Sequence, residues 1–462
     1  MAVIPIKKKT KKTWLDQKRS PSIDNKIRKS LWYSILDASF YSAMLGFGES
    51  FLSAFAVFLR ANNIQLGLLG SLPQTLGSLS QLFSERLLKL FKSRKNFVCT
   101  SAFLHALMYI PIALAFFIER FRVEFLILFV CLYFIVGMIA GSAWSSWMGD
   151  LVSEEKRGSY FSKRNTIAGL VSFITLLLGG YLLQISNGSK LEQYIGFAII
   201  FTLALLFRIT SFIFLTRKYE PTYNFQQKNG FSFFEFIKKA PSNNYGLFIL
   251  FLSLMNFSIF IAGPFFTAYM LYDLRLNYLI YTIVLSAAII SKYLSMPTWG
   301  KLIDLYGTKK VLTLSAFLMP LVPLLWIFSP NVIYLIIIQL YSGFVWAGFE
   351  TSSFTFLFDT IIPQRRAKYI AYSNVLNGIA LFIGALLGGV LVRYNNLFWS
   401  KYMLVFIVST ILRYTVSFIF IPKLKEVRNV EKITYPRLFF SVINTMSSRG
   451  LIYSMLFFKK KK

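Results

Sequence analysis

Two glutamates stand well inside long apolar stretches of this 462-residue chain. An ionisable side chain placed in hydrocarbon is costly, and it is a functional suspect by default. Glu49 precedes Leu59 by ten residues, roughly 15 Å of helical rise, and shares a helical face with Ser42 and Gly46. We interpret Glu49 as a carboxylate that binds a proton or a cation. The alternative is a structural pair with a buried partner.

Glu350 lies in another apolar stretch, nine residues before Asp359, with Trp346 and Ser353 on its face. The same two alternatives apply to it. Asp37 lies only about 9 Å from the end of its stretch, so we expect it to pair with a nearby Lys or Arg. A direct role in binding a solute or a coupling ion is the alternative for Asp37.

Two arginines, Arg208 and Arg413, lie in apolar stretches near one end of each. Both could reach the membrane interface by extending their side chains. Their matched placement predicts ion pairs with Asp150 and Asp359, respectively, in a structural or gating role. Lys292 is expected to extend to the interface in the same way.

The remaining reactive side chains are few. His105 is the single histidine, and we expect it to be a satisfied core residue; Cys99 and Cys131 lie inside apolar segments and are expected to pack there. Such a chain offers no metal-binding or nucleophile–base constellation. We therefore expect no metal site, no cofactor and no enzymatic activity.

A charged stretch occurs twice in the same register. Residues 149–165 read GDLVSEEKRGSYFSKRN, and residues 358–374 read FDTIIPQRRAKYIAYSN. At a constant offset, Asp150 matches Asp359, Arg157 matches Arg366, and Asn165 matches Asn374. A second echo pairs LLFRITSFIF (205–214) with ILRYTVSFIF (411–420). The chain therefore consists of one structural unit repeated.

The elements that position these residues are apolar segments long enough to cross a bilayer. The composition is 56% hydrophobic and only 15% charged, and segments of roughly 20 residues span hydrocarbon as helices. Twelve are predicted, six in each repeat: 31–58, 64–83, 98–118, 123–148, 165–185, 193–216, 246–271, 277–299, 310–328, 331–357, 370–392 and 400–421.

The basic residues are distributed unequally between the two sides of the membrane. About 40 of the 50 Lys and Arg residues fall on the side of both termini, against about 7 on the other. This excess predicts cytoplasmic termini and accounts for the net charge of +31 without nucleic acid. Anionic lipid of the inner leaflet is the expected partner. The segment FSFFEFIKK and the tail from residue 436 are expected to lie at the membrane surface as amphipathic helices.

The loop GKLIDLYGTKK (300–310) resembles the signature loop of the major facilitator superfamily. Gly300, Asp304, Gly307, Lys309 and Lys310 match the signature, whereas Leu305 and Thr308 depart from it. The equivalent first-half loop, SERLLKLFKSRKNF, lacks the acid. The stretch WSSWMGDLVSEEKRGSYFSKRN resembles a bacterial and archaeal branch of this superfamily.

The resemblance implies two six-helix bundles that rock about a central site. It implies that Asp304 docks near the start of helix five, around Asn165, as a latch between the halves. It also implies that helices 1, 4, 7 and 10 line a cavity, to which Asn256 would contribute a hydrogen bond and Trp144 an aromatic wall. Because these four helices carry no mid-membrane Arg or Lys, we expect a neutral or cationic solute.

The sequence therefore predicts an all-α secondary active transporter of the plasma membrane, monomeric, with proton coupling through Glu49 or Glu350 as a hypothesis. A non-transporting scaffold or receptor on the same fold is the alternative. The expected units are a basic tail (1–30), an N-terminal bundle (31–216), a linker (217–245), a C-terminal bundle (246–421) and a basic amphipathic tail (422–462).

Overall fold

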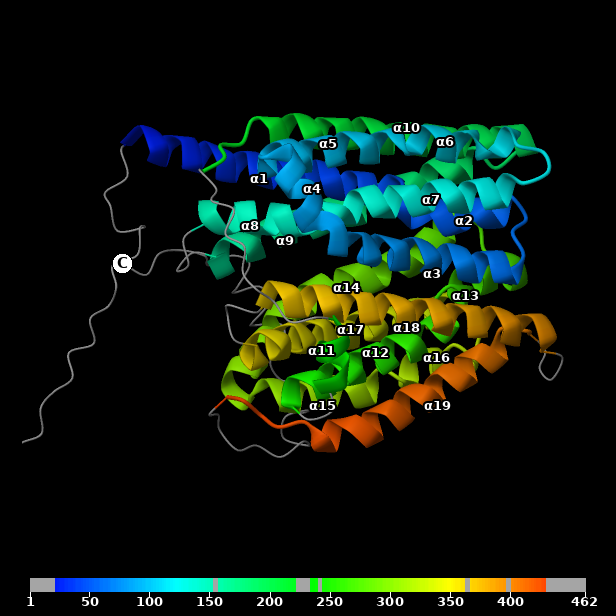
Figure 1. Cartoon of the computed structure of the whole chain (residues 1–462). Coiled ribbons are helices and arrows are strands. Elements are labelled where there is room, and N and C mark those ends of the chain that lie inside the picture. Colours follow the sequence, from blue (N-terminus) through cyan, green and yellow to red (C-terminus); the bar gives the residue numbers. More distant parts are fainter. Residues whose placement is uncertain are drawn as a thin grey trace, which may run out of the picture.

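The computed structural model describes residues 21–152, 157–221, 233–239, 243–361, 366–395 and 400–428. Within these ranges every regular element is helical. Figure 1 shows long helices running side by side, with the start of α1 and the described end of the chain on the same side. We call this the terminal side and the opposite one the distal side. The tail expected to form an interfacial helix lies outside the described residues.

The first repeat forms a set of helices that ends where the linker begins. These are α1 (Pro21–Phe47), η2 (Glu49–Phe51), α2 (Leu52–Phe58), α3 (Asn63–Ser80), η3 (Gln81–Phe83), α4 (Ser84–Phe91), α5 (Arg94–Leu107), α6 (Tyr109–Leu114), η4 (Ala115–Phe117), α7 (Arg122–Ile139), α8 (Gly141–Leu151), α9 (Arg157–Ile185) and α10 (Lys190–Thr216).

The linker and the second repeat follow the same plan. Their helices are α11 (Phe233–Lys239), α12 (Asn244–Ala262), α13 (Phe265–Ala268), η7 (Tyr269–Asp273), α14 (Tyr278–Tyr306), α15 (Thr308–Leu318), α16 (Leu321–Leu325), α17 (Val332–Thr360), α18 (Arg366–Tyr394), α19 (Met403–Phe420) and η9 (Ile421–Lys423).

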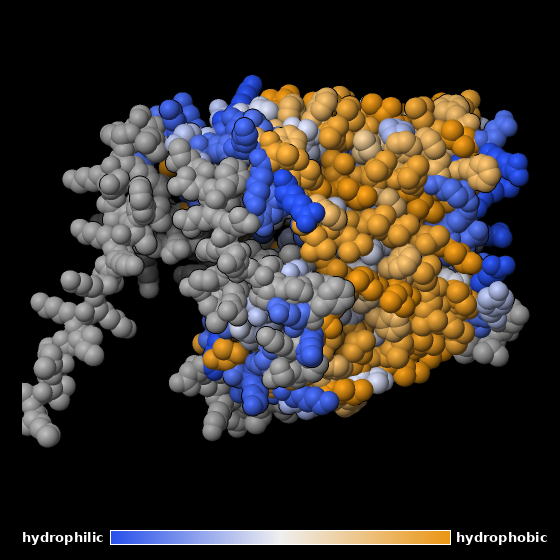
Figure 2. Space-filling view, in the orientation of Figure 1, coloured by the Kyte–Doolittle hydropathy of each residue, from blue (hydrophilic) through white to orange (hydrophobic). Residues whose placement is uncertain are grey.

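Eleven continuous or jointed helices of the described chain are long and apolar enough to cross a membrane. The remaining membrane-level helix, α3, is less apolar because it is rich in Gly, Ser, Thr and Gln and packs between other helices. Its Thr75 hydroxyl donates to the carbonyl of Gly378 in α18 at 2.6 Å. Figure 2 shows a broad apolar band between two polar rims, as a multi-pass membrane protein requires. The predicted twelve-helix fold is thus confirmed.

The two repeats share one apolar core cluster on the distal side, whereas on the terminal side each repeat has clusters of its own. One buried cluster contains Phe51 and Phe55 of the first repeat together with Phe265 and Tyr402 of the second. Toward the terminal side, the first repeat has its own cluster around Trp147. The second repeat has separate clusters there, which include Phe248 and Trp299. The two halves are therefore closed against each other distally.

The linker segment expected to lie at the membrane surface forms the short helix α11, and one of its aromatic residues packs against protein rather than lipid. Phe236 is only 4% exposed. Its ring lies 5.9 Å from that of Tyr245, 5.6 Å from that of Tyr369 and 5.5 Å from that of Tyr372. Three tyrosines at the terminal ends of α12 and α18 thus take the place of the expected lipid contact.

Candidate functional site

Glu49 lies at a break in the first membrane helix. The α-helix ends at Phe47 and resumes at Leu52, with the 3-10 turn η2 between them. A Cβ on Gly48 would meet the hydroxyl of Tyr109 at 2.2 Å, so only glycine permits this approach. The break places Glu49 against α7, where the hydroxyl of Tyr133 donates to its Oε2 at 3.1 Å.

Aromatic hydroxyls surround this carboxylate. The Tyr109 hydroxyl donates to the Tyr133 hydroxyl at 3.1 Å, and both lie against the sulfur of Met44. The ring of His105 packs against that of Tyr133 at a tilt of 30°, with centroids 3.9 Å apart. Glu49 forms no ion pair among the described residues. Tyr133 is the one hydrogen-bond donor to Glu49 found among the described residues. Because this donor is neutral, the carboxylate can bind a proton or a cation.

Arg208 belongs to the same half but not to the predicted ion pair. Its Nε donates to Nδ1 of His105 at 3.1 Å, and its Nη1 donates to Ser211 at 2.8 Å. Asp150, the predicted partner, binds Arg94 instead. The prediction was wrong because Arg208 is buried at 8% exposure and turns inward, where it finds α5 rather than the loop.

Asp37 is the centre of a buried charged group, as its expected pairing role requires. Its carboxylate accepts hydrogen bonds from Ser211 at 2.8 Å and from Lys218 at 2.9 Å. Arg164 adds a longer ion pair at 3.8 Å. Burial lowers the pKa of Lys218, and the Asp37 carboxylate opposes that shift. No solute contact is needed to explain these charges.

Arg413 departs from its prediction in the same way. It is 2% exposed and donates to Ser409 at 3.1 Å and to the carbonyl of Ile259 at 3.5 Å. Its expected partner, Asp359, binds Arg428. No ion pair of Arg413 occurs in the described part of the chain. Its role is therefore to join α19 to α12.

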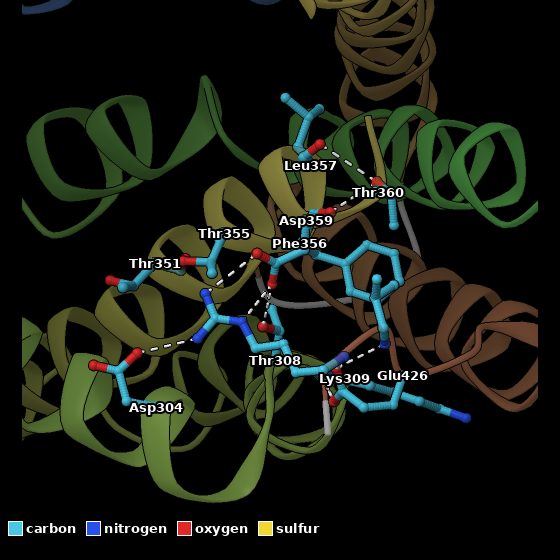
Figure 3. A network of polar contacts seen from close by, with 12 residues as sticks. Asp304, Thr308, Lys309, Thr351, Thr355, Phe356, Leu357, Asp359, Thr360 and Glu426 are labelled. Carbon is cyan, nitrogen blue, oxygen red and sulfur yellow. Dashed lines mark hydrogen bonds and ion pairs between the residues drawn. The ribbon is translucent and has the colours of Figure 1, made fainter. Parts of the chain in front are cut away.

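The second-half acid network lies on the terminal side, shown in Figure 3. Arg428 donates from Nε and Nη2 to Asp359, at 2.7 and 3.2 Å, and from Nη1 to Asp304 at 3.0 Å. Thr308 adds a hydrogen bond to Asp359 at 3.0 Å. The hydrogen bond to Asp359 raises the pKa of Arg428.

In this distally closed arrangement Asp304 does not dock at the start of α9, a contact that is expected only when the halves close on the terminal side. Its partner is Arg428 of its own half, and Asn165 is exposed. The backbone N–H of Lys309 donates to Glu426 at 2.8 Å. Gly307 ends α14 with φ 94°, a conformation that favours glycine, whereas a Cβ on Gly300 would meet nothing within 4 Å. Lys310 lies one residue further into α15.

The first half repeats this network with a different arginine. Arg94, at the start of α5, donates from Nη1 to Asp150 at 2.7 Å. Its backbone N–H donates to Glu220 at 2.7 Å. The sequence analysis missed Glu220 and Glu426. Both follow the last helix of their repeat, and they are paired by the offset that matches SFIF at 211–214 with SFIF at 417–420. The side chains of Arg157 and Arg366 lie outside the described part.

Glu350 has a cation partner that the sequence analysis assigned to the interface. Lys292 of α14 lies 3.1 Å from the Glu350 carboxylate of α17. Lys292 is on the side of α14 away from exposed Leu294, because two residues turn a helix by about 200°. The prediction of a snorkelling lysine was therefore wrong. The reason is that α14 and α17 pack against each other although they are not consecutive.

The two predicted uncharged contacts differ in their surroundings. Asn256 is half-buried, and no hydrogen bond to its amide is found among the described residues. Ser353, one turn beyond Glu350, likewise has a buried hydroxyl with no partner there. The ring of Trp144 is instead covered by the guanidinium of Arg164, 4.7 Å away. Trp147, one turn along the same helix, is fully buried and donates to the carbonyl of Tyr219 at 2.9 Å.

No group of three His, Cys, Asp or Glu side chains with metal-ligand geometry occurs in the described ranges. The chemistry on offer is therefore that of single acids, hydroxyls and one amide inside the membrane. These groups bind protons, cations or polar solutes. They lack a nucleophile held by a base.

The family model of the Major Facilitator Superfamily matches residues 38–260 and again residues 246–459. An MFS-type transporter of Aspergillus terreus is 31% identical over 105 residues, 23% of this chain and 19% of that one. The rubrofusarin-specific efflux pump aurT of Gibberella zeae is 31% identical over 119 residues, 26% of this chain and 22% of that one. The chain thus spans about a fifth of the length of these relatives.

Solved structures of transporters share the fold. A D-xylose-proton symporter superposes with a TM-score of 0.68 at 12% identity, covering 89% of this chain and 100% of that one. The nucleoside transporter NupG superposes with a TM-score of 0.56 at 16% identity, covering 87% and 99%. Because the family model covers both repeats, the chain belongs to the major facilitator superfamily.

Proposed function

We propose that the protein is a secondary active transporter that moves a small solute by alternating access of its two halves. The observation that carries the proposal is the division of the apolar core. One cluster joins the halves distally, and separate clusters serve each half on the terminal side. Such an arrangement is one of the two end states that a rocking pair of bundles requires.

The terminal side is the cytoplasmic side in this proposal, because the basic residues concentrate there. The structure then corresponds to an arrangement closed to the outside. We further propose that the protein lies in the plasma membrane as a monomer. Its basic rim would contact anionic lipids of the inner leaflet.

Glu49 is the proposed coupling group. It lies at a helix break inside the membrane, and the one donor to its carboxylate found in the described part of the chain is the neutral hydroxyl of Tyr133. A carboxylate without a cationic partner can change its protonation state without breaking an ion pair. Glu350 is less suited to this role because Lys292 holds it at 3.1 Å.

The charges inside the membrane favour a neutral or cationic solute. Lys292 lies on α14, which is not one of the four helices expected to line the cavity, and it forms an ion pair with Glu350 at 3.1 Å. Glu49 has no counter-ion among the described residues, and a dianionic solute beside it would meet its negative charge. Asn256 and the Ser353 hydroxyl are the proposed hydrogen-bonding contacts.

The proteins with similar sequence or fold are described as an efflux pump and a proton symporter. These descriptions support transport of a small organic solute. They belong to those proteins, and the solute of this chain is to be found by experiment.

The test begins with thermal unfolding of the detergent-solubilised full chain against metabolites, metal ions and cationic drugs at several pH values. A ligand at 100 times its Kd stabilises by about 2.7 kcal/mol. The stabilising solute is then followed into proteoliposomes under a pH gradient. We expect Glu49→Gln to abolish the response to the gradient and Glu119→Gln, on the exposed distal surface, to keep it.

Uptake driven equally well in Glu49→Gln would rule out this residue as the coupling group. Tight binding of a dianionic solute would contradict the charge argument. If no compound stabilises the protein, the scaffold alternative gains, and deletion of residues 1–20 and 435–462 then tests whether partners bind the tails.

A further inference from the structure

The distal face of the second half contains a hollow of about 680 Å³ that none of the predicted site residues lines. Its wall combines the aromatic rings of Tyr269, Tyr272 and Phe328 with two basic side chains, Arg275 and Lys401, and one acid, Asp273. Ligand sites of drug-sized molecules have volumes of about 300–1,000 Å³ and are mostly apolar with a few polar groups. The volume of the hollow lies within this range, and its lining combines apolar and charged side chains.

The backbone around the hollow is unusual. Residues Tyr269–Asp273 form a π-helix, in which the N–H of Leu274 donates to the carbonyl of Tyr269 at 3.0 Å. Arg275 follows with φ 50°, in the left-handed region that non-glycine residues seldom adopt. π-helical turns are rare and occur often at functional sites. Both features fall on residues that line the hollow.

The acidic side chain of the hollow has a hydrogen-bond donor, whereas its two basic side chains have no acidic partner in the described part of the chain. The Asp273 carboxylate accepts a hydrogen bond from Ser400 at 2.5 Å. Arg275 and Lys401 form no ion pair among the described residues, and the Lys401 ammonium lies 5.4 Å from the ring of Tyr402. Two cations thus stand against one carboxylate that already has a donor.

We propose that this hollow binds an organic anion: a flat apolar body against the aromatic wall, with a carboxylate, sulfonate or phosphate held by Arg275 and Lys401. Arginine and lysine donate charge-assisted hydrogen bonds to such groups. The headgroup of an anionic lipid offers the same chemistry as a dissolved aromatic anion, and the experiment below distinguishes these two sources.

Two residues at the hollow also hold the halves together. The Tyr272 hydroxyl donates to the carbonyls of Val57 and Ala61 in the first half, at 3.0 and 3.2 Å. Next to Lys401, the Tyr402 hydroxyl donates to Oδ1 of Asn63 at 3.3 Å. A ligand that packs against Tyr272 therefore binds best when these contacts are formed. Binding to one arrangement in preference to the other shifts the population toward it, so the anion should favour distal closure.

Binding is tested with naphthalene-2-sulfonate on the full chain in phosphatidylcholine nanodiscs, by isothermal titration calorimetry. We expect saturable binding, weakened by about tenfold or more in Lys401→Gln and in Arg275→Gln. Arg120→Gln, an exposed arginine on the distal side of the first half, should leave the affinity unchanged. The cationic analogue 2-naphthylmethylammonium should not compete.

Equal loss in Arg120→Gln, no loss in Lys401→Gln, or binding of the cation would overturn the proposal. Nanodiscs that contain phosphatidylglycerol identify the source. If this lipid competes with the sulfonate in the wild type but not in Lys401→Gln, the occupant is a lipid headgroup. If it does not compete, the occupant is a dissolved anion.

The link to distal closure is tested with spin labels at Leu191→Cys and Ile333→Cys, exposed positions at the distal ends of α10 and α17. Naphthalene-2-sulfonate should increase the fraction of short label distances in the wild type. Tyr272→Phe keeps the ring but removes the donor, so it should still bind the sulfonate and lose the shift in distance. A shift that persists in Tyr272→Phe would refute the link through this hydroxyl.

Discussion

The carboxylate of Glu220 accepts the backbone N–H of Arg94 at 2.7 Å, and the second repeat forms the same contact between Glu426 and the N–H of Lys309 at 2.8 Å. In each repeat, an acid that follows the last helix thus binds the start of the third membrane helix, which is α5 in the first repeat and α15 in the second. A carboxylate suits this position because free N–H groups and the positive end of the helix dipole meet there. The repeat therefore extends beyond the helices to their connections.

Arg94, which completes this network in the first half, should contribute more to stability than an exposed ion pair such as that of Lys89 and Glu85. Arg94 is fully buried and binds Asp150 at 2.7 Å. Arg94→Ala removes the cation from half-exposed Asp150 and from Glu220, and we expect a loss of about 1–3 kcal/mol. Lys89→Ala removes an exposed pair with Glu85 and should cost less than about 0.5 kcal/mol. Unfolding of the two variants in detergent, by thermal or chemical denaturation, measures the difference, and equal losses would contradict it.

The two acids bound by Arg428 should differ in the same measurement. The Asp359 side chain is 19% exposed and accepts two hydrogen bonds from Arg428, whereas that of Asp304 is 77% exposed and accepts one. We expect Asp359→Asn to cost about 1–2 kcal/mol and Asp304→Asn less than about 0.5 kcal/mol. A larger effect of Asp304→Asn would indicate that this acid also contacts the other half in a second arrangement.

The sequence predicted the repeat and the twelve helices, because the length of the apolar segments determines them. It did not predict the partners. Arg208 has an equivalent in Arg413, but the repeat does not reveal that Arg208 turns toward His105. Lys292 was placed at the interface because its partner Glu350 is on a helix far along the chain. The length of a helix can be read from its own segment of sequence. The partner of a buried charge depends on how two helices are rotated and which helices are neighbours.

The helix break at Glu49 also escaped the sequence analysis, and it yields a prediction about Gly48. A Cβ at this position would lie 2.2 Å from the Tyr109 hydroxyl and 2.6 Å from its ring. Gly48→Ala should therefore destabilise the protein by about 1–3 kcal/mol through overpacking. Gly141→Ala is the matched control, because a Cβ there meets nothing within 4 Å, and it should be neutral or slightly stabilising.

Thermal unfolding checks the stability of both glycine variants, and solute binding checks the site. If Gly48→Ala unfolds like Gly141→Ala, the Tyr109 ring can move away and the break at η2 is not held by this contact. A loss of stability with retained solute binding would separate packing of the break from the role of Glu49.

The buried group around Asp37 should respond to pH through Lys218. Asp37→Asn removes the carboxylate that binds the Lys218 ammonium at 2.9 Å, and we expect a loss of about 3 kcal/mol at neutral pH. Burial lowers the pKa of Lys218, and without Asp37 nothing in that pair opposes the shift. Between the lowered pKa of the folded state and the unfolded lysine pKa of about 10.4, the unfolded chain binds more protons than the folded one, so stability rises with pH in this window. The defect of Asp37→Asn should therefore shrink between about pH 7 and about pH 9.5, relative to wild type, when unfolding is measured at both values.

Asp24→Asn, an exposed acid of α1, should follow the wild type at each pH. The double variant Asp37→Asn with Lys218→Met removes both charges, so it should recover part of the lost stability and show no pH-dependent defect. A constant defect in Asp37→Asn, or no recovery in the double variant, would mean that the buried ammonium is not its cause.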